Sequence, residues 1–310
     1  MVTKGNMASE TTRDVIIVGA GPAGCTAAIY ASRYKLDTLM IADEIGGLML
    51  YADMVENFPG FGSIKGKDLM QQMIDQALDL QVDLIQARVD SIAGTGNFFT
   101  VKAGDAIFHA RAIILATGTI RRKLGVPGEE ENIGMGVSYC ATCDAPFFKK
   151  RTCCVIGGSD SAAKEALVLS RIAKKVHVIY RKSRLRAEPL LSDRVYNTAN
   201  IEVIHDSNVK EICTNKQGLV NKVLLDDGSE LETNGVFIEI GFDPNSSIAK
   251  DLDIELNEHG EIIVDKNMST NVPGVFAAGD VTNGILKQAI TASGDGAKAS
   301  WSAYQHVLSW

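Results

Sequence analysis

The stretch Asp14-Val15-Ile16-Ile17-Val18-Gly19-Ala20-Gly21-Pro22-Ala23-Gly24 decides how this 310-residue chain folds. Its first five residues form an apolar run typical of a buried strand, and a helical pattern follows from Cys25 to about Tyr34. Gly-x-Gly-x-x-Gly in this setting is the turn that receives the pyrophosphate of a dinucleotide. The first Gly makes the tight turn, the second admits the phosphate, and the third lets the helix pack on the strand. The helix N-terminus attracts the anion, so the stretch predicts an α/β dinucleotide-binding domain.

A second turn of this kind begins at Gly157. The apolar run Cys153–Ile156 leads into Gly157-Gly158-Ser159-Asp160-Ser161-Ala162, a helix to about Ile172 and a strand Val176–Tyr180. Ala is tolerated at the third position, whereas a side chain at Ser159 crowds the pyrophosphate. Basic residues stand in Arg181–Arg186, where an acid would bind a free ribose hydroxyl. They favour a 2′-phosphate, and therefore NADPH over NADH.

Two closely spaced cysteines, Cys140 and Cys143, lie between the two turns, with Asp144 directly after them. Such a pair closes a small disulfide or forms half of a zinc site. A helix start would lower the thiol pKa, and Asp144 could move a proton during thiol–disulfide exchange. No second pair follows and the histidines are scattered, so redox chemistry is favoured over a metal. The five histidines are His109, His177, His205, His259 and His306.

Further candidate cofactor contacts lie outside the turns. A strand Thr38–Ile41 precedes Ala42-Asp43-Glu44, where an acid could hold a ribose. Gly46-Gly47-Leu48 suggests close approach of a flat group, and Asn57 could hydrogen-bond to it, although each is also compatible with an ordinary turn. Gly279-Asp280 ends a later strand, where an acid can accept hydrogen bonds from the ribityl hydroxyls of a flavin. Two dinucleotides and one disulfide require a two-electron mediator, which a flavin supplies.

Composition bounds the class of protein. The length predicts about two domains, and 45% hydrophobic residues with 29 glycines suit an α/β enzyme. A net charge of −7 argues against nucleic acid as a partner. No apolar run reaches the roughly 18 residues of a membrane span, and the polar N-terminus does not resemble a signal peptide, so we expect a cytoplasmic protein. The remaining cysteines are most simply core residues.

Several segments together resemble the low-molecular-weight thioredoxin reductases over essentially the whole chain. The matching segments are GAGPAG, VENFPG, ATG, CATCDAPFF, the second glycine turn, and TNVPGVFAAGD followed by KQAITASGDG. The resemblance implies two Rossmann-like domains: an FAD-binding domain from residues 1–115 and 242–310, and an inserted NAD(P)H-binding domain, 116–241, that carries the cysteines. It also implies a hinge about which the inserted domain rotates.

The resemblance further implies a thioredoxin-disulfide reductase, typically a homodimer. FAD would pass two electrons from NADPH to the Cys140–Cys143 disulfide, which would reduce thioredoxin. Cys143 would lie next to the flavin, Cys140 would exchange with the partner, and Asp144 would act as acid and base. The expected FAD contacts are Gly19, Gly21, Pro22, Ala23, Gly24, Ile41, Ala42, Asp43, Gly46, Gly47, Leu48, Asn57, Gly118, Gly279, Asp280, Lys287, Gln288 and Ala289. The expected NADPH contacts are Ser159, Asp160, Ser161, Ala162, Arg181, Lys182 and Arg186.

Three departures from the family pattern bear on the cofactors. Leu48 stands where the family has Gln, Ser159 replaces a Gly, and Tyr180-Arg181-Lys182 replaces His-Arg-Arg. The last two concern only the nicotinamide, so reduced ferredoxin or a deazaflavin stays an alternative donor. The C-terminal Trp310 suggests an aromatic tail that stacks on the flavin or on a dimer partner, the alternative being a frayed end.

Other functions remain as alternatives. A ferredoxin–NADP reductase of this fold would not require Cys140 and Cys143, whereas a dithiol oxidase would pass the electrons to oxygen. A flavin-based redox sensor would use the same parts without turnover. The larger disulfide reductases are disfavoured, because their extra interface domain and C-terminal His-Glu pair are not found.

Overall fold

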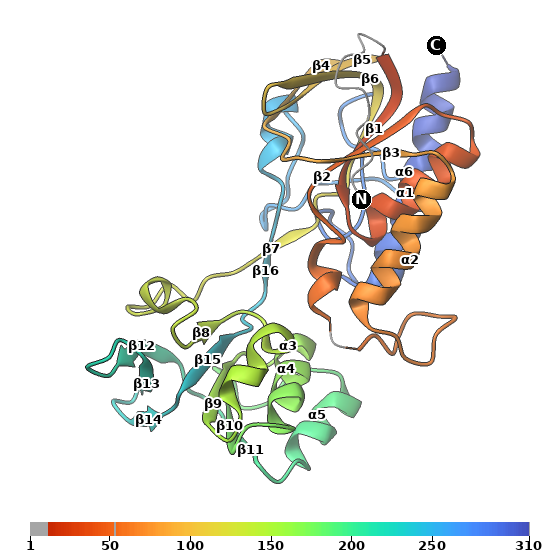
Figure 1. Ribbon diagram of the computed structural model, residues 1–310. Coiled ribbons are helices and arrows are strands. Elements are labelled where there is room, and N and C mark those ends of the chain that lie inside the picture. The colour runs from red at the N-terminus through yellow and green to blue at the C-terminus, as the bar shows by residue number, and fades with distance from the viewer. Residues whose placement is uncertain (1–11, 53, 310) are drawn as a thin grey trace. The chain divides into compact units, whose positions relative to one another are not determined.

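The computed structural model describes residues 12–52 and 54–309 (Figure 1). The chain divides into two compact units. The first unit comprises Met1–Ile120 and Asp243–Trp310, and the second comprises Arg121–Phe242. Both are built from parallel strands and helices, which confirms the predicted α/β class. Trp310 lies outside the described residues.

The sheet of the first unit is centred on β1, which the first glycine turn follows. Across the sheet the strands run β3 (Asp83–Gln86), β2 (Thr38–Ile45), β1 (Thr12–Ala20), β6 (Ala106–Leu115), β5 (Phe98–Ala103) and β4 (Ser91–Thr95). β1, β2, β3 and β6 are parallel, whereas β4 and β5 run antiparallel. The first half of β6 pairs with β5, and its last three residues pair with the parallel strand β17 (Val275–Ala277). Parallel strands end at one edge of the sheet, so the turns after β1, β6 and β17 come together there.

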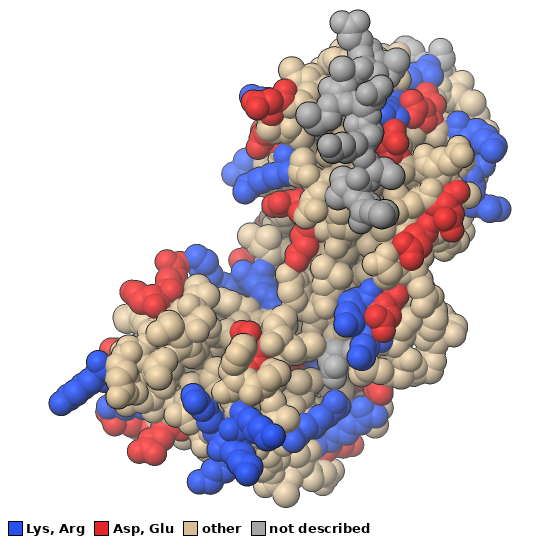
Figure 2. All heavy atoms as spheres, in the orientation of Figure 1, with Lys and Arg blue, Asp and Glu red and all other residues tan. Residues whose placement is uncertain are grey.

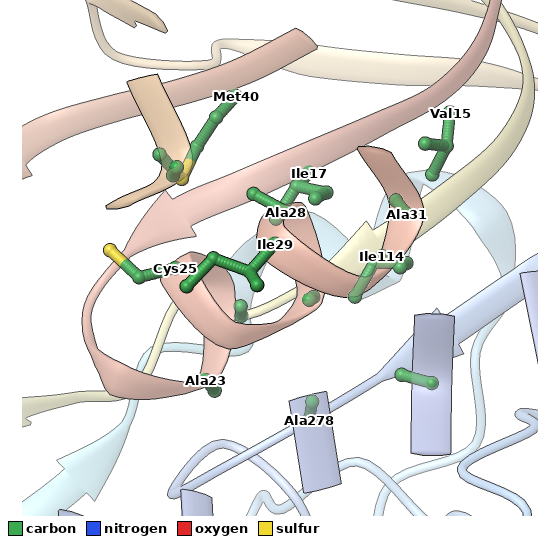
Figure 3. Close-up of a cluster of buried hydrophobic side chains, with 14 of the residues drawn as sticks. Val15, Ile17, Ala23, Cys25, Ala28, Ile29, Ala31, Met40, Ile114 and Ala278 are labelled. Atoms are coloured by element: carbon green, nitrogen blue, oxygen red, sulfur yellow. The ribbon is translucent and has the colours of Figure 1, made fainter. Parts of the chain in front are cut away.

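Side chains of β1 alternate between the two faces of this sheet. Val15 and Ile17 pack under the helices α1 (Pro22–Arg33), α2 (Gly66–Asp79) and α6 (Ala289–Leu308), and Figure 3 shows Ile17 beside Ala28 of α1. Ile16 and Val18 pack on the opposite face with residues of β4, β5 and the 3₁₀-helix Ser247–Leu252. Burial on both faces is the reason that β1 reads as a continuous apolar run.

The second unit repeats the plan with a smaller sheet. Its parallel strands run β11 (Ile201–Ile204), β10 (Lys175–Ile179), β9 (Thr152–Ile156), β15 (Gly235–Ile238) and β8 (Val137–Ser138). The helices α3 (Ala141–Asp144), α4 (Asp160–Ser170) and α5 (Pro189–Tyr196) cover one face. The antiparallel strands β12 (Val209–Thr214), β13 (Val220–Leu225) and β14 (Glu230–Glu232) cover the other.

The chain passes between the units twice, in β7 (Thr119–Arg121) and β16 (Phe242–Pro244), which pair with each other. Within the first unit, Thr117 Oγ1 donates to Asn245 O at 2.7 Å and Asn245 N donates to Gly118 O at 2.9 Å. These bonds keep the residues after β6 in the first unit. The unit boundaries therefore fall after Ile120 and Phe242, later than the expected positions after 115 and 241.

Alanine substitutions at Gly296 and Gly294 test the close contact between α1 and α6. A Cβ on Gly296 would overlap the Ala23 carbonyl oxygen and lie 3.1 Å from Ala27 N, whereas a Cβ on Gly294 would meet nothing within 4 Å. We expect Gly296→Ala to lower the free energy of unfolding by about 1–3 kcal/mol. Gly294→Ala, in the same helix, should raise it by about 0.5–1 kcal/mol, because Ala restricts the unfolded chain. Urea unfolding measures both values, and effects of the same sign would contradict the packing described.

Candidate active site

The first glycine turn places three backbone segments against one another. Gly19 has a φ of +113°, and a Cβ there would overlap Ala116 O at the end of β6. A Cβ on Gly24 would overlap the carbonyl oxygen of Gly19. At Gly21, by contrast, a Cβ would meet nothing within 4 Å, so open space lies in front of the first turn of α1. The two outer glycines are required by packing and the middle one leaves room for a ligand.

Other residues predicted to contact FAD lie around this open space. The Cβ position of Gly47 is 3.6 Å from Gly21 Cα, and that of Gly279 is 2.9 Å from Ala23 Cβ. Asn57 Nδ2 donates to Gln288 Oε1 at 3.0 Å. The structure thus brings Gly47 and Gly279 to the N-terminal end of α1, and it joins Asn57 to Gln288.

The predicted polar and charged contacts differ in their surroundings. Burial raises the pKa of the Asp280 carboxyl, an effect that Lys287 opposes and Asp295 reinforces. Lys287 Nζ is held by Glu261 at 3.0 Å. Asp43 is exposed within β2, and neighbouring Ala42 is buried, its carbonyl oxygen accepting from Ala87 N at 2.9 Å.

Three further predicted positions offer only backbone or apolar groups. Ile41 is buried in β2, and Leu48 lies in the 3₁₀-helix Gly47–Tyr51. Gly118 follows β6 with a φ of +63°.

The second glycine turn has the same construction. Gly157 has a φ of +143°, and a Cβ there would overlap Glu239 O after β15 and lie 3.2 Å from Ala162 Cβ. Ala162 therefore fills the third position without a clash. Ser159 caps α4 with a φ of −86°, so its side chain causes no backbone strain. A Cβ on Gly158 would lie 2.6 Å from the ring of Tyr180, which packs over the turn.

The basic segment after β10 is tied to this turn. Arg186 N donates to Gly158 O at 2.8 Å, and Asp160 Oδ1 accepts from Glu188 N at 2.8 Å. Arg181, Lys182 and Arg186 are exposed and form no ion pair with any described residue. Figure 2 shows Lys and Arg side chains grouped on the second unit. Three exposed cationic side chains therefore lie in the segment that is hydrogen-bonded to the second glycine turn.

Cys140 and Cys143 form a disulfide, with their Cα atoms 5.4 Å apart. The short helix α3 begins directly after Cys140, whose sulfur accepts a hydrogen bond from Cys143 N at 3.1 Å. Cys140 N donates to Ser138 Oγ at 3.0 Å, and Asp144 N donates to Cys140 O at 3.1 Å. After reduction, the N–H bond to the Cys140 sulfur favours its thiolate. Cys140 is 8% exposed, and Cys143 lies among the exposed residues.

The sequence pattern predicts no role for Glu165, Glu239 or Arg121. In the structure, Glu165 bonds to the disulfide turn and Arg121 bonds to Glu239. Glu165 Oε2 accepts from Ala141 N at 2.6 Å, and Arg121 donates to Glu239 Oε1 at 2.8 Å. Burial raises the pKa of Glu165 to about 7, and burial together with the Glu165 charge raises that of Glu239 to about 8. A signal was present in the sequence, because Glu165 shares helical spacing with Ala162 and Leu169, and Glu239 interrupts an apolar strand.

The other cysteines differ sharply from this pair. Cys25, Cys153 and Cys154 are fully buried, and burial raises the pKa of each thiol to about 12. Over residues 12–52 and 54–309 no cluster of His, Cys, Asp and Glu could hold a metal ion. Within the same residues, no helix is long and apolar enough to cross a membrane.

Comparison with known proteins agrees with this arrangement. Residues 13–296 match the family model of the pyridine nucleotide-disulphide oxidoreductases. The thioredoxin reductase of Listeria monocytogenes is 45% identical over 307 residues, which cover 97% of this chain and 96% of that protein. That of Bacillus subtilis is 42% identical over 306 residues, with the same coverage. The chain belongs to the low-molecular-weight thioredoxin reductases.

A solved structure of this family has the same fold. The thioredoxin reductase of Lactococcus lactis superposes with a TM-score of 0.93 at 39% identity, covering 96% of this chain and 100% of that one. The resemblance deduced from the sequence motifs is confirmed, and so is the fold of two dinucleotide-binding domains. The roles predicted for individual residues stay predictions.

Alkylation distinguishes the two kinds of cysteine in this thioredoxin reductase family member. After reduction with dithiothreitol and its removal, brief treatment with iodoacetamide at pH 7 should modify Cys140 and Cys143. Cys25, Cys153 and Cys154 should stay unmodified, because only the thiolate reacts and their thiols are buried and protonated. Peptide mass spectrometry with and without prior reduction measures this. Rapid modification of any of the three would contradict their burial.

Proposed function

We propose that this protein is a flavin-dependent thioredoxin-disulfide reductase that takes electrons from NADPH. The observation that carries the proposal is the Cys140–Cys143 disulfide at the start of α3, in a unit that also holds a dinucleotide turn. A zinc site would need two more ligands, and a ferredoxin–NADP reductase would not need the cysteines. The relatives named above act on thioredoxin, so thioredoxin or a similar protein is the proposed partner.

The residues around Gly21 fit FAD. The open space at Gly21 admits a pyrophosphate next to the free N–H groups of α1. Asn57 and Gln288 offer amide donors and acceptors, and Asp280 offers a carboxyl at the end of β17 for ribityl hydroxyls. FAD supplies the two-electron relay between a nicotinamide and a disulfide.

The protein's own groups then exchange the electrons with the partner. The thiolate of one cysteine attacks the partner disulfide, a mixed disulfide forms, and the second cysteine displaces the reduced partner while the Cys140–Cys143 bond re-forms. Asp144, next in sequence to Cys143, provides or accepts the proton that the leaving sulfur requires. The hydrogen bond from Cys143 N makes Cys140 the better thiolate, consistent with its proposed role as the exchanging sulfur. By family resemblance we also propose a homodimer in the cytoplasm.

Serine substitutions test the function directly. Cys140→Ser and Cys143→Ser should each lower the rate of NADPH-dependent thioredoxin reduction by more than about 100-fold, because exchange needs both sulfurs. Cys213→Ser, which alters the other cysteine that is not fully buried, should leave the rate unchanged. If either of the first two variants retains full turnover, the proposed reaction is wrong.

Substitutions in the basic segment test whether NADPH is the electron donor. Substituting Ala for Arg181, Lys182 and Arg186 together should raise KM for NADPH by about tenfold or more, since each charge-assisted phosphate contact contributes at least about 0.5 kcal/mol. KM for NADH should change little, and Lys216→Ala, at an exposed lysine of the second unit, serves as the control. Steady-state reduction of thioredoxin measures both constants, and anaerobic bleaching of the flavin identifies the donor. Should the wild-type flavin stay oxidised with NADPH but bleach with reduced ferredoxin, the donor assignment fails while the disulfide chemistry stands.

A further inference from the structure

A group of buried charged side chains is hydrogen-bonded to the backbone of the disulfide turn. It combines three residues of the second unit: Arg121 at the end of β7, Glu165 on α4 and Glu239 after β15. Glu165 and Glu239 are 8% and 5% exposed. Glu165 accepts from Ala141 N at 2.6 Å, and Ala141 is the residue that follows Cys140 in the redox motif. The carboxylate therefore acts on the backbone that shapes the disulfide turn.

The charges within this group do not balance when both acids are ionised. Arg121 donates to Glu239 at 2.8 Å and lowers the pKa of both carboxyls, but it is one cation facing two acids. Asp144 of α3 also acts on the pair, because its negative charge raises the pKa of Glu165. Two like charges in a buried site do not both ionise readily, so the pair holds a proton in the neutral range.

Reduction of the disulfide adds a further negative charge to this surrounding. The favoured thiolate is that of Cys140, whose sulfur already accepts a hydrogen bond from Cys143 N. Cys140 directly precedes Ala141, whose N–H donates to Glu165. A new anion on the residue that precedes the N–H bound by Glu165 makes protonation of the pair more favourable.

We propose that Glu165 is a positioning residue for the disulfide turn and that Glu165 and Glu239 together take up a proton when the disulfide is reduced. Two electrons break the S–S bond, one sulfur takes a proton from solvent to become a thiol, and the other stays a thiolate. A second proton from solvent goes to the carboxyl pair. The disulfide and the acid pair together thus accept two electrons and two protons, although only one sulfur is protonated. The two electrons come from the flavin in the enzyme, or from dithiothreitol in the test below.

This inference rests on the proposed redox function, but its test does not use FAD, NADPH or thioredoxin. Failure of thioredoxin reduction would reject the function, whereas the alkylation profile of the reduced protein reports only on the acid pair.

The experiment measures the rate of iodoacetamide modification of Cys140 and Cys143 between pH 5 and 10 in the dithiothreitol-reduced full chain. In Glu165→Gln the amide oxygen still accepts from Ala141 N, but the charge is lost. The midpoint of the profile should therefore move to lower pH by about half a unit or more, about threefold in rate below the midpoint. In Glu239→Gln the pKa of Glu165 falls, because its acidic neighbour is gone, and Glu165 stays ionised. The negative charge of Glu165 disfavours the thiolate, so the midpoint of the Glu239→Gln profile should move to higher pH. Glu230→Gln, at an exposed glutamate paired with Lys222, should leave it in place.

A redox titration against dithiothreitol at several pH values gives a second readout. The wild type should take up more protons per two electrons between pH 6 and 9 than Glu165→Gln does. A purely structural role of Glu165 would not change this number. If Glu165→Gln does not fold, as judged by circular dichroism, the opposite shift expected of Glu239→Gln still decides. Shifts in the same direction for both variants, or no shift beyond that of Glu230→Gln, would overturn the proposal.

Discussion

The contact between a glycine turn and the end of a neighbouring strand is the constraint on which both units depend. Gly19 lies on the carbonyl of Ala116, and Gly157 lies on the carbonyl of Glu239. In each case a side chain would overlap backbone atoms, and the positive φ excludes most other residues. The close approach brings the helix N-terminus level with the edge of the sheet. Because both units repeat this geometry, each presents helix N–H groups at an edge where a dinucleotide can bind.

In the second unit the same contact connects the dinucleotide turn to the redox pair. Glu239 supports Gly157 through its backbone, and its side chain bonds to Arg121, on the strand by which the chain enters this unit. Its neighbour Glu165 bonds to Ala141 within the disulfide turn. Two hydrogen bonds and the charge of Glu165 acting on Glu239 therefore connect the crossing strand, the nucleotide turn and the disulfide turn. A change in charge at one of these places alters the electrostatic potential at the others.

The sequence predicted the parts of this molecule whose causes are local. The strand before Gly19, the helix after it and their repeat around Gly157 followed from apolar runs and glycine spacing, and the structure has them as β1, α1, β9 and α4. β6 runs unbroken from Ala106 to Leu115, although Arg111 interrupts its apolar pattern. The short strand β4 and the helix α5 were not predicted, because their sequences carry little periodicity and tertiary contacts determine them.

The candidate site shows the same division. Cys140, Cys143 and the glycines follow a spacing that can be read in one dimension. The partnership of Glu165 with Ala141 joins residues 24 apart, and that of Arg121 with Glu239 joins residues 118 apart. Such pairs depend on how helix and strand ends meet in the sheet, which no local pattern encodes. A glutamate in a helix is ordinarily taken for a solvated residue, and only its coincidence with the apolar stripe of α4 argues otherwise.

Stability alone does not explain why this buried group is ionic. Burying two carboxyls with one guanidinium costs desolvation energy, and apolar side chains of similar size often serve a fold as well or better. The folded protein holds the protons of Glu165 and Glu239 more tightly than an unfolded chain does, since their pKa values rise from 4.5 to about 7 and about 8. Their contribution to stability is therefore greatest below pH 4.5 and is lost as the pH rises through 7 and 8. A pair that weakens the fold at neutral pH, yet holds the backbone of the disulfide turn, is better explained by the proton demand of the redox reaction than by packing.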